Sequence, residues 1–355
     1  MRRFTKILGT AVLTLLVGGP VGGASASSGS VPGGPGGPPP GTAAWLADDS
    51  LGRRLPDPAT ATPSEVAAFF GGLTTAQQQR LVVDHPGVVG NLDGAPVALR
   101  YQANAPAGDR VLAYDPRGRG LIAQVVGDLE NAAQVAVIVP GSDIDLSTFD
   151  RTARQAAHLR QQVVHLVQQA ANLRQQAAPL RQPAAPLRQQ AGGDTAVIAW
   201  AGYPTPAGIG LDQATGRLAG AGAERLSRFI AGLDASGLPD PTLFCHSYGS
   251  VVCGLAAAET DACDIVVLGS PGMRADHVTA LDTEARIWAA KSPNDWIRRV
   301  PHVQFLGLGH GADPTSPDFG ATVLPADDVP AHDAYFTPGT STLTAFAAIV
   351  AGAPR

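Results

Sequence analysis

The 355-residue sequence lacks the features that mark several common classes of protein. Basic residues are not in excess, because 25 Lys and Arg stand against 30 Asp and Glu and the net charge is −5, so no nucleic acid is expected as a partner. Neither a P-loop nor a G-x-G-x-x-G motif follows any apolar run, which gives no support to nucleotide binding. H-E-x-x-H and paired His and Cys spacings are also missing, so no metal is expected. We therefore predict that the protein works without a cofactor.

Cysteine and aromatic residues are scarce as well. With only Cys245, Cys253 and Cys263, stability must come from the core, and a hydrophobic content of 45% is enough for one of ordinary size. A bridge between Cys253 and Cys263 is one interpretation, since ten residues could return a helix to the start of a strand. Buried free thiols are the alternative.

Residues 1–26 have the pattern of a cleaved export signal. Arg2, Arg3 and Lys6 precede an apolar run, and Ala24-Ser25-Ala26 supplies the small residues that signal peptidase requires. The run has about 11 residues, whereas a membrane-spanning helix needs about 20, so a signal is favoured over an anchor. We expect a secreted protein without a stable membrane anchor, whose net charge changes from −5 to −8 as these three positive charges are removed.

Three regions are expected after the signal. Residues 27–42 are rich in Pro and Gly and are typical of a flexible linker. Residues 43–105 predict a small N-terminal helical subdomain, in which Thr62 and Glu65 have the spacing of a capping box and a second helical run closes on Pro86. The rest, 106–352, is the main domain.

Apolar runs in the main domain predict a sheet. Two runs joined by a turn, 110–115 and 121–129, indicate a hairpin. Later runs are apolar without alternation, as in parallel strands that are buried on both faces. These runs are 134–141, 195–203, 241–247, 264–272 and 285–290. Helical segments at 216–233 and 250–259 lie between them, so the order predicts an α/β fold with a mostly parallel, doubly wound sheet.

A seven-residue repeat interrupts this order at 158–192. Five leucines recur in register, namely Leu159, Leu166, Leu173, Leu180 and Leu187. The first three units predict an amphipathic helix, which the prolines of the later units stop. The segment carries arginines and no acidic residue, so contact with an anionic surface is one interpretation. Tandem expansion of a surface loop is the other.

The sharpest motif is Phe244-Cys245-His246-Ser247-Tyr248-Gly249-Ser250. A buried strand leads directly to Ser247, with Gly249 and a helix after it, which matches the nucleophile elbow G-x-S-x-G except for Cys245 in place of the first glycine. Such a turn exposes the serine Oγ at the carboxyl end of the sheet. A helix N-cap is the alternative role for this serine.

An elbow requires an acid and a base on later loops. Asp295 follows the run 285–290 in a polar turn and is the expected acid, although a turn or cap role would also suit it. We prefer His332 as the base because it lies in a long loop between a strand and the last helix. His310 is the second candidate. We expect His246 to pack or hydrogen-bond beneath the elbow, at the edge of the substrate site.

Backbone donors are expected on both sides of Ser247. The N–H of Tyr248 opens the following helix, and the run 134–141 leads to Gly141 and Ser142, whose N–H could complete an oxyanion hole. A plain turn is the alternative for the Pro-Gly sequence. The predicted substrate-binding residues are Gly141, His246 and Tyr203. Tyr203 lies in the loop 202–210.

The sequence resembles a known family on six stretches: HPGVVGNLDGAPVALRYQAN, VAVIVPGSDIDLSTFD, LFCHSYGSVVC, DIVVLGSPGM, DPTSPDFGATV and AHDAYF. Together they are similar to an actinobacterial α/β-hydrolase family of largely uncharacterised proteins, over residues 43–352. The resemblance implies an α/β-hydrolase fold with Ser247 as nucleophile and Asp295 and His332 as acid and base. The heptad insertion departs from the family pattern.

These patterns predict a secreted serine hydrolase, of carboxylesterase or lipase type, that cleaves a small-molecule or lipid ester through an acyl-enzyme on Ser247. Amide or thioester cleavage is an alternative reaction. A non-catalytic secreted binding protein that keeps the fold is the alternative class.

Overall fold

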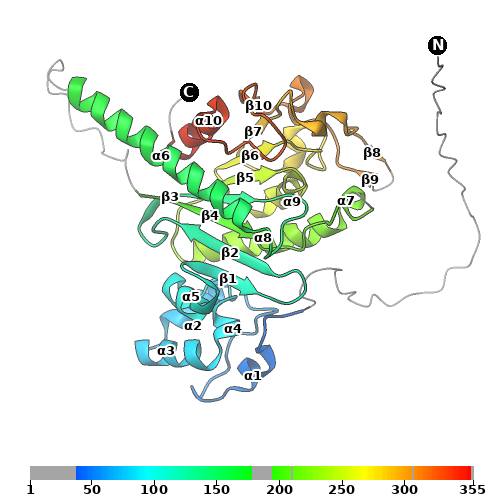
Figure 1. Cartoon of the computed structure of the whole chain (residues 1–355). Helices are drawn as coiled ribbons and strands as arrows, with labels where there is room; N and C mark the ends of the chain where they lie inside the picture. Colours follow the sequence, from blue (N-terminus) through cyan, green and yellow to red (C-terminus); the bar gives the residue numbers. More distant parts are fainter. Residues whose placement is uncertain (1–36, 178–193, 209–210, 306–307, 353–355) are drawn as a thin grey trace, which may run out of the picture.

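The computed structural model describes residues 37–177, 194–208, 211–305 and 308–352 (Figure 1). The predicted export signal, most of the linker and the proline-containing repeat units lie outside these residues.

An eight-stranded sheet forms the centre of the fold. Its order is β1 (Val111–Asp115), β2 (Leu121–Val126), β4 (Asp194–Ala201), β3 (Ala132–Val139), β5 (Thr242–His246), β6 (Asp264–Leu268), β7 (Arg286–Ala290) and β10 (Thr322–Val323). The first two pairings, β1–β2 and β2–β4, are antiparallel, and all the later ones are parallel. The predicted α/β class, hairpin and mostly parallel sheet are therefore confirmed.

Helices cover both faces of this sheet. On one face lie α6 (Asp150–Ala177) and α10 (Ser341–Val350), and on the other lie α8 (Arg217–Ala235) and α9 (Gly249–Ala256). Neighbouring residues of a strand enter different cores, since Val137 and Leu243 pack with α8 and α9 while Ile138 and Phe244 pack with α6 and α10. This two-sided burial explains why the strands are apolar without alternation.

The N-terminal helices have a hydrophobic cluster of their own, which includes Trp45, Phe70 and Leu81. These helices are α1 (Thr42–Ala47), α2 (Pro63–Gly71), α3 (Thr75–Asp84), α4 (Pro86–Val89) and α5 (Val97–Ala103). The capping box expected at Thr62 and Glu65 is present at the start of α2. Figure 1 shows these helices beyond the β1 edge of the sheet, and α2 also contacts α8.

The remaining elements are short. Among the described residues they are α7 (Leu211–Thr215), the antiparallel pair β8 (Gln304–Phe305) and β9 (Leu308–Gly309), and 3-10 helices at Ala105–Ala107, Ala257–Glu259, Val278–Leu281, Trp296–Arg299 and Pro317–Phe319. The pair β8–β9 lies just before His310 and is separate from the main sheet. No helix among the described residues has the length and apolar character that crossing a bilayer requires.

The seven-residue repeat is helical over its first units, within α6. Leu159 and Val163 are fully buried against the sheet, Leu166 is half-buried, and Leu173 is 65% exposed. Within the described part of the repeat, the leucine seam is therefore packed only where α6 crosses the sheet, and Figure 1 shows the far end of the helix extending past it.

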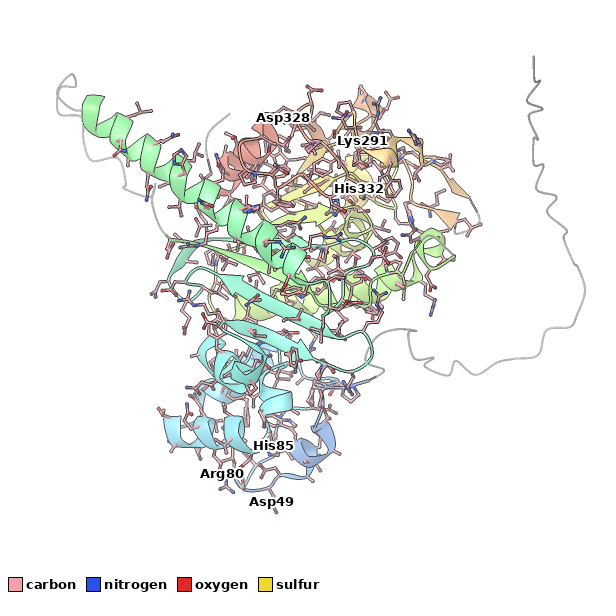
Figure 2. All side chains as sticks on the ribbon, in the orientation of Figure 1. Asp49, Arg80, His85, Lys291, Asp328 and His332 are labelled. Atoms are coloured by element: carbon pink, nitrogen blue, oxygen red, sulfur yellow. A yellow bond between two sulfur atoms is a disulfide. The ribbon has the colours of Figure 1, made fainter. Side chains whose placement is uncertain are left out.

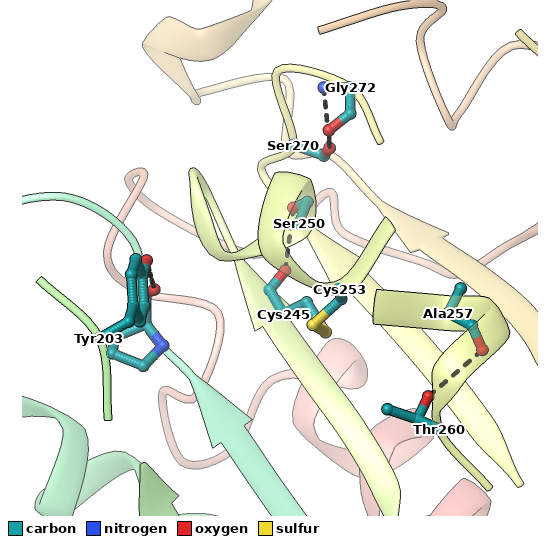
Figure 3. The surroundings of a disulfide bond; sticks show 9 residues. Tyr203, Cys245, Ser250, Cys253, Ala257, Thr260, Ser270 and Gly272 are labelled. Carbon is teal, nitrogen blue, oxygen red and sulfur yellow. Dashed lines mark hydrogen bonds between the residues drawn. A yellow bond between two sulfur atoms is a disulfide. The ribbon is translucent and has the colours of Figure 1, made fainter. Parts of the chain in front are cut away.

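The structure pairs Cys245 with Cys253 and leaves Cys263 free and exposed. Neither the Cys253–Cys263 bridge nor a set of buried free thiols is present. The elbow after β5 turns α9 back along the strand, which brings the Cα atoms of Cys245 and Cys253 within 6.3 Å (Figure 3). Cys263 lies instead beside the start of β6, at the opposite end of the sheet from the elbow.

Replacing both Cys245 and Cys253 by alanine is expected to lower the free energy of unfolding by about 2 to 4 kcal/mol, because the link restricts the unfolded chain. Guanidinium unfolding measures the change. The matched control is Cys263→Ala, which should stay within about 0.5 kcal/mol of the parent because that residue is exposed and forms no disulfide. Equal losses in the two proteins would contradict the pairing.

Candidate active site

Ser247 lies in a sharp turn between β5 and α9. Its φ of 54° is in the left-handed region, which a residue with a side chain adopts only under strain. Its N–H donates to the carbonyl of Leu268 on the neighbouring strand at 2.8 Å. A Cβ at Gly249 would overlap the carbonyl oxygen of Val139, so this position requires glycine. The turn has the geometry expected of a nucleophile elbow.

His332 connects Ser247 to Asp295. Its Nε2 lies 2.9 Å from Ser247 Oγ, and its Nδ1 lies 2.8 and 2.9 Å from the two oxygens of Asp295. Because a carboxylate only accepts, Nδ1 carries the proton and Nε2 is free to accept from the serine hydroxyl. The structure thus brings together Ser247, His332 and Asp295. Figure 2 shows His332 in the half of the molecule opposite the N-terminal helices that carry His85.

Asp295 is buried and held by several donors. Besides His332, it accepts from the Tyr335 hydroxyl at 2.7 Å and from the N–H of Ile297 at 2.8 Å. Burial would raise the pKa of Asp295, but the hydrogen bonds from His332, Ile297 and Tyr335 outweigh it and hold the pKa below its ordinary value. Asp295 therefore faces His332 as a carboxylate at neutral pH.

His246 supports the backbone of His332. Its Nε2 donates to the His332 carbonyl at 2.8 Å, and the two rings are 4.7 Å apart. Burial, with the nearby His332 as a second cause, lowers the pKa of His246 to about 4. His246 is therefore uncharged at neutral pH and places no positive charge beside His332. This is the packing and hydrogen-bonding role expected beneath the elbow.

His310 does not reach Ser247. Its ring stands edge-on to Tyr248 at 5.7 Å, and its Nδ1 has no hydrogen-bond partner among the described residues. Burial, followed by the charge of Arg274, lowers the pKa of His310 to about 4. Of the two candidate bases, only His332 touches the serine.

Gly141 keeps the space beside Ser247 open. A Cβ on this glycine would lie 2.7 Å from Ser247 Cβ and 3.1 Å from Tyr248 N. In the part of the chain that the structure describes, the N–H groups of Ser142 and Tyr248 have no acceptor. The Ser142 hydroxyl accepts from Gln213 at 2.7 Å, which positions that side chain. Two free backbone donors thus flank the elbow.

Two pockets open on Ser247. The first, of about 200 Å³, is slightly more polar than apolar and is called the polar pocket, and the residues that line it include Gly141, Thr152, Gln155, His246 and His332. The second, of about 350 Å³, is mostly apolar, and its lining includes Tyr248, Ile297, Val300 and His310. Ser142, Gln213, Ser247 and Trp296 line both.

Tyr203 is buried and does not line either pocket at Ser247. It is 1% exposed, its hydroxyl donates to the Pro140 carbonyl at 2.7 Å, and its ring stacks on Trp200 at 5.9 Å. It lines neither pocket, so the prediction that Tyr203 contacts substrate is wrong. The residue follows β4, next to β3 in the sheet, and supports the turn before Gly141 from the α8 side.

His246, His332 and Asp333 offer possible metal-ligand atoms within 4.8 Å of one another. Both ring nitrogens of His332 are already used by Ser247 and Asp295, and His246 Nε2 donates to a carbonyl. A cation bound by this group would break the serine–histidine contact, so the group fits the Ser–His–Asp arrangement better than a metal site.

Several residues of the pockets escaped the sequence analysis. Thr152 and Gln155 lie in the first turns of α6, and Gln213 lies in α7, with no local pattern to distinguish them. Trp296 had a signal, since it directly follows Asp295, and its ring lies 4.6 Å from that of His332.

A sequence profile described as alpha/beta hydrolase matches residues 115–305, more than half of the chain. The chain belongs to this family. The resemblance found in the sequence is thereby confirmed, and membership supports hydrolase activity as the general class.

Among curated relatives of this alpha/beta hydrolase, an uncharacterized protein of Mycobacterium tuberculosis is 27% identical over 396 residues, covering 84% of this chain and 57% of that protein. An uncharacterized protein of Mycobacterium bovis is 30% identical over 233 residues, covering 61% of this chain and 71% of that protein. The chain therefore spans little more than half the length of the first of these relatives.

Two solved structures are similar to this alpha/beta hydrolase at low scores. A serine hydrolase without a lid from Xanthomonas campestris has a TM-score of 0.37 and 14% identity, covering 66% of this chain and 88% of that one. The esterase domain of a Rhodothermus marinus protein has a TM-score of 0.34 and 13% identity, covering 66% of this chain and 92% of that one.

Tyr335→Phe is expected to lower the free energy of unfolding by at least about 1.5 to 3 kcal/mol at pH 7, because it removes a buried hydrogen bond to a charged group and also the bond that the hydroxyl accepts from the Ser292 N–H. A carboxylate with a lowered pKa contributes stability above its ordinary value of 3.8, and this stability is lost as pH falls through the folded pKa. The destabilisation should therefore shrink in acid, as measured by guanidinium unfolding from pH 7 to pH 3.

The control is Tyr203→Phe, which loses one hydrogen bond between neutral groups, worth about 0.5 to 1.5 kcal/mol. Burial raises the pKa of Tyr203 well above its ordinary value, so its loss should not depend on pH in this range. The same pH dependence in both variants would contradict the role assigned to Tyr335.

Proposed function

We propose that this chain is a secreted serine hydrolase that cleaves a carboxylic ester through an acyl-enzyme on Ser247. The observation that carries the proposal is the unbroken hydrogen-bond chain from Ser247 Oγ through His332 to Asp295, at 2.9 and 2.8 Å. A serine that served only as a helix N-cap would not require a hydrogen bond to a histidine whose opposite nitrogen is bound by a buried carboxylate.

The serine attacks the ester carbonyl carbon, and His332 Nε2 accepts the hydroxyl proton. Asp295 holds Nδ1–H and stabilises the imidazolium that forms. When the tetrahedral intermediate collapses, the bond between the carbonyl carbon and the alcohol oxygen breaks, and His332 returns the proton to that oxygen. Water then attacks the acyl-enzyme by the same route, releasing the acid and Ser247.

The N–H groups of Ser142 and Tyr248 stabilise the oxyanion of each tetrahedral intermediate. Each such donor contributes on the order of 3 kcal/mol to lowering the barrier. Glycine is required at position 141, because a Cβ there would lie 2.7 Å from Ser247 Cβ and 3.1 Å from Tyr248 N, beside one of these donors.

Secretion is part of the proposal. The charged start, apolar run and small residues of 1–26 support export, and the Cys245–Cys253 pair is compatible with an oxidising compartment. We expect the protein recovered from the culture medium of an expressing actinobacterium to begin close to Ser27, as read by N-terminal sequencing. Protein confined to cells with Met1 intact would contradict export and leave the hydrolase proposal standing.

Ser247→Ala is expected to lower the turnover of p-nitrophenyl butyrate by about three orders of magnitude or more, because it removes the nucleophile. The same variant should lose labelling by a fluorophosphonate probe, which reacts only with an activated serine. Ester hydrolysis is followed by nitrophenolate release, and labelling by gel fluorescence. Matched butyryl anilide and thioester substrates identify the bond that is cleaved fastest.

The control is Ser236→Ala, at the exposed end of α8, which should retain both turnover and labelling. A parent protein that neither labels nor hydrolyses any of these substrates would favour the non-catalytic binding protein. A Ser247→Ala variant with full activity would end the assignment of this serine.

A further inference from the structure

The two pockets differ in which catalytic group they contain. His332 lines the polar pocket and is absent from the lining of the apolar one, whereas Tyr248 lines only the apolar pocket. This inference rests on the mechanism above, in which His332 donates a proton to the oxygen of the alcohol leaving group. That oxygen therefore lies on the His332 side of Ser247, and the alcohol occupies the polar pocket.

The acyl group must then lie on the other side of Ser247. The pocket there, of about 350 Å³, is walled mainly by Ala214, Pro271, Ile297, Val300 and Val303. His310 is its one titratable side chain besides Tyr248, and with its pKa lowered to about 4 it brings no charge at neutral pH. A wall of this kind favours an unbranched aliphatic chain, and the volume is at the small end of ligand pockets.

The polar pocket suits a small hydroxylated group. Thr152 lines it, is 1% exposed, and has an Oγ1 without a hydrogen-bond partner among the described residues. Such an orphaned hydroxyl costs free energy unless a ligand satisfies it. Gln155, also buried, donates to the Asp333 carbonyl at 3.5 Å, close to the limit for a hydrogen bond, so its amide can turn to a ligand.

Charge around the polar pocket disfavours an anionic alcohol. Arg151 and Asp333 form an ion pair at 3.3 Å, and Asp143 adds a second carboxylate to the lining. With one positive and two negative side chains, the pocket has no excess positive charge for a phosphate group.

We propose that the substrate is an ester of a medium-length aliphatic acid with a small, uncharged, hydroxylated alcohol, the acyl chain lying in the apolar pocket and the alcohol in the polar pocket. The two halves of the ester are thus recognised separately, by α7 and the segment 296–303 on one side and by the start of α6 on the other.

Two matched series of esters test this. Ethyl esters and 1-monoacylglycerols of acetic, butyric, hexanoic and octanoic acids are compared by kcat/KM, with the released acid as readout. We expect kcat/KM to rise by about fourfold for each methylene until the apolar pocket is filled. Each glycerol ester should exceed its ethyl ester by about threefold to tenfold, because the glycerol hydroxyls satisfy Thr152 and Gln155.

Two variants separate the pockets. Ala214→Trp, at a partly exposed position on α7, should lower the hexanoate-to-acetate ratio at least tenfold and leave the glycerol-to-ethyl ratio as in the parent. Thr152→Val replaces an unpartnered hydroxyl by a methyl group and should lower the glycerol-to-ethyl ratio by about threefold or more, with the chain-length ratio retained. The rate of fluorophosphonate labelling reports whether each variant keeps a folded, reactive Ser247.

The failures are distinguishable. A parent protein that labels with fluorophosphonate and hydrolyses all the esters without either preference overturns this inference and leaves the proposed function intact. Exchanged effects, in which Ala214→Trp changes only the alcohol ratio, would reverse the pocket assignment and also overturn it. A parent protein without labelling or hydrolysis overturns the proposed function itself.

Discussion

Ser247 has a φ of 54°, a conformation that costs a residue with a side chain roughly 1 to 3 kcal/mol. Three interactions around it hold this turn. The Ser247 N–H donates to Leu268 O at 2.8 Å. The Ser250 hydroxyl donates to Cys245 O at 3.1 Å, and Cys245 is linked to Cys253, as Figure 3 shows. The turn is therefore fixed from the strand side and from the helix side at once. Because the turn is fixed, the serine Oγ and the N–H that follows it emerge at the same edge of the sheet, where every other group of the site must meet them.

The groups that meet the serine are tied to one another as well as to the sheet. His332 is held through its ring by Asp295 and through its carbonyl by His246, so separate contacts position the ring and the backbone. Tyr335, three residues after His332, bonds to Asp295 and accepts from the N–H of Ser292. The loop after β7 and the loop before α10 are thus joined around one buried carboxylate, and displacement of either loop would disturb both acid and base.

Local sequence patterns predicted the parts of the molecule whose structure is determined by residues close together in the sequence. Unbroken apolar runs indicated β3 to β7 because two-sided burial leaves no room for polar alternation, and Ser247 with Gly249 after a strand indicated the elbow. The rest depends on distant packing. The pairing of Cys245 follows from the direction in which α9 leaves the turn, and Tyr203 is buried because Trp200 and Pro140 meet it. Thr152 and Gln213 reach the site only through the placement of whole helices, while β8, β9 and β10 have two residues each and no period to detect.

The position of the repeat within α6 explains how the chain accommodates it. The wall of the polar pocket comes from the first turns of this helix, with Arg151, Thr152 and Gln155. At 1.5 Å per residue, Leu173 lies about 30 Å further along the axis, where it is 65% exposed. Figure 1 shows this end of α6 extending past the sheet. Extra helical turns at that end add length without moving the first turns, because Leu159 and Val163 fix the helix against the strands in between. The site therefore depends on where α6 begins, and it is insensitive to where the helix ends.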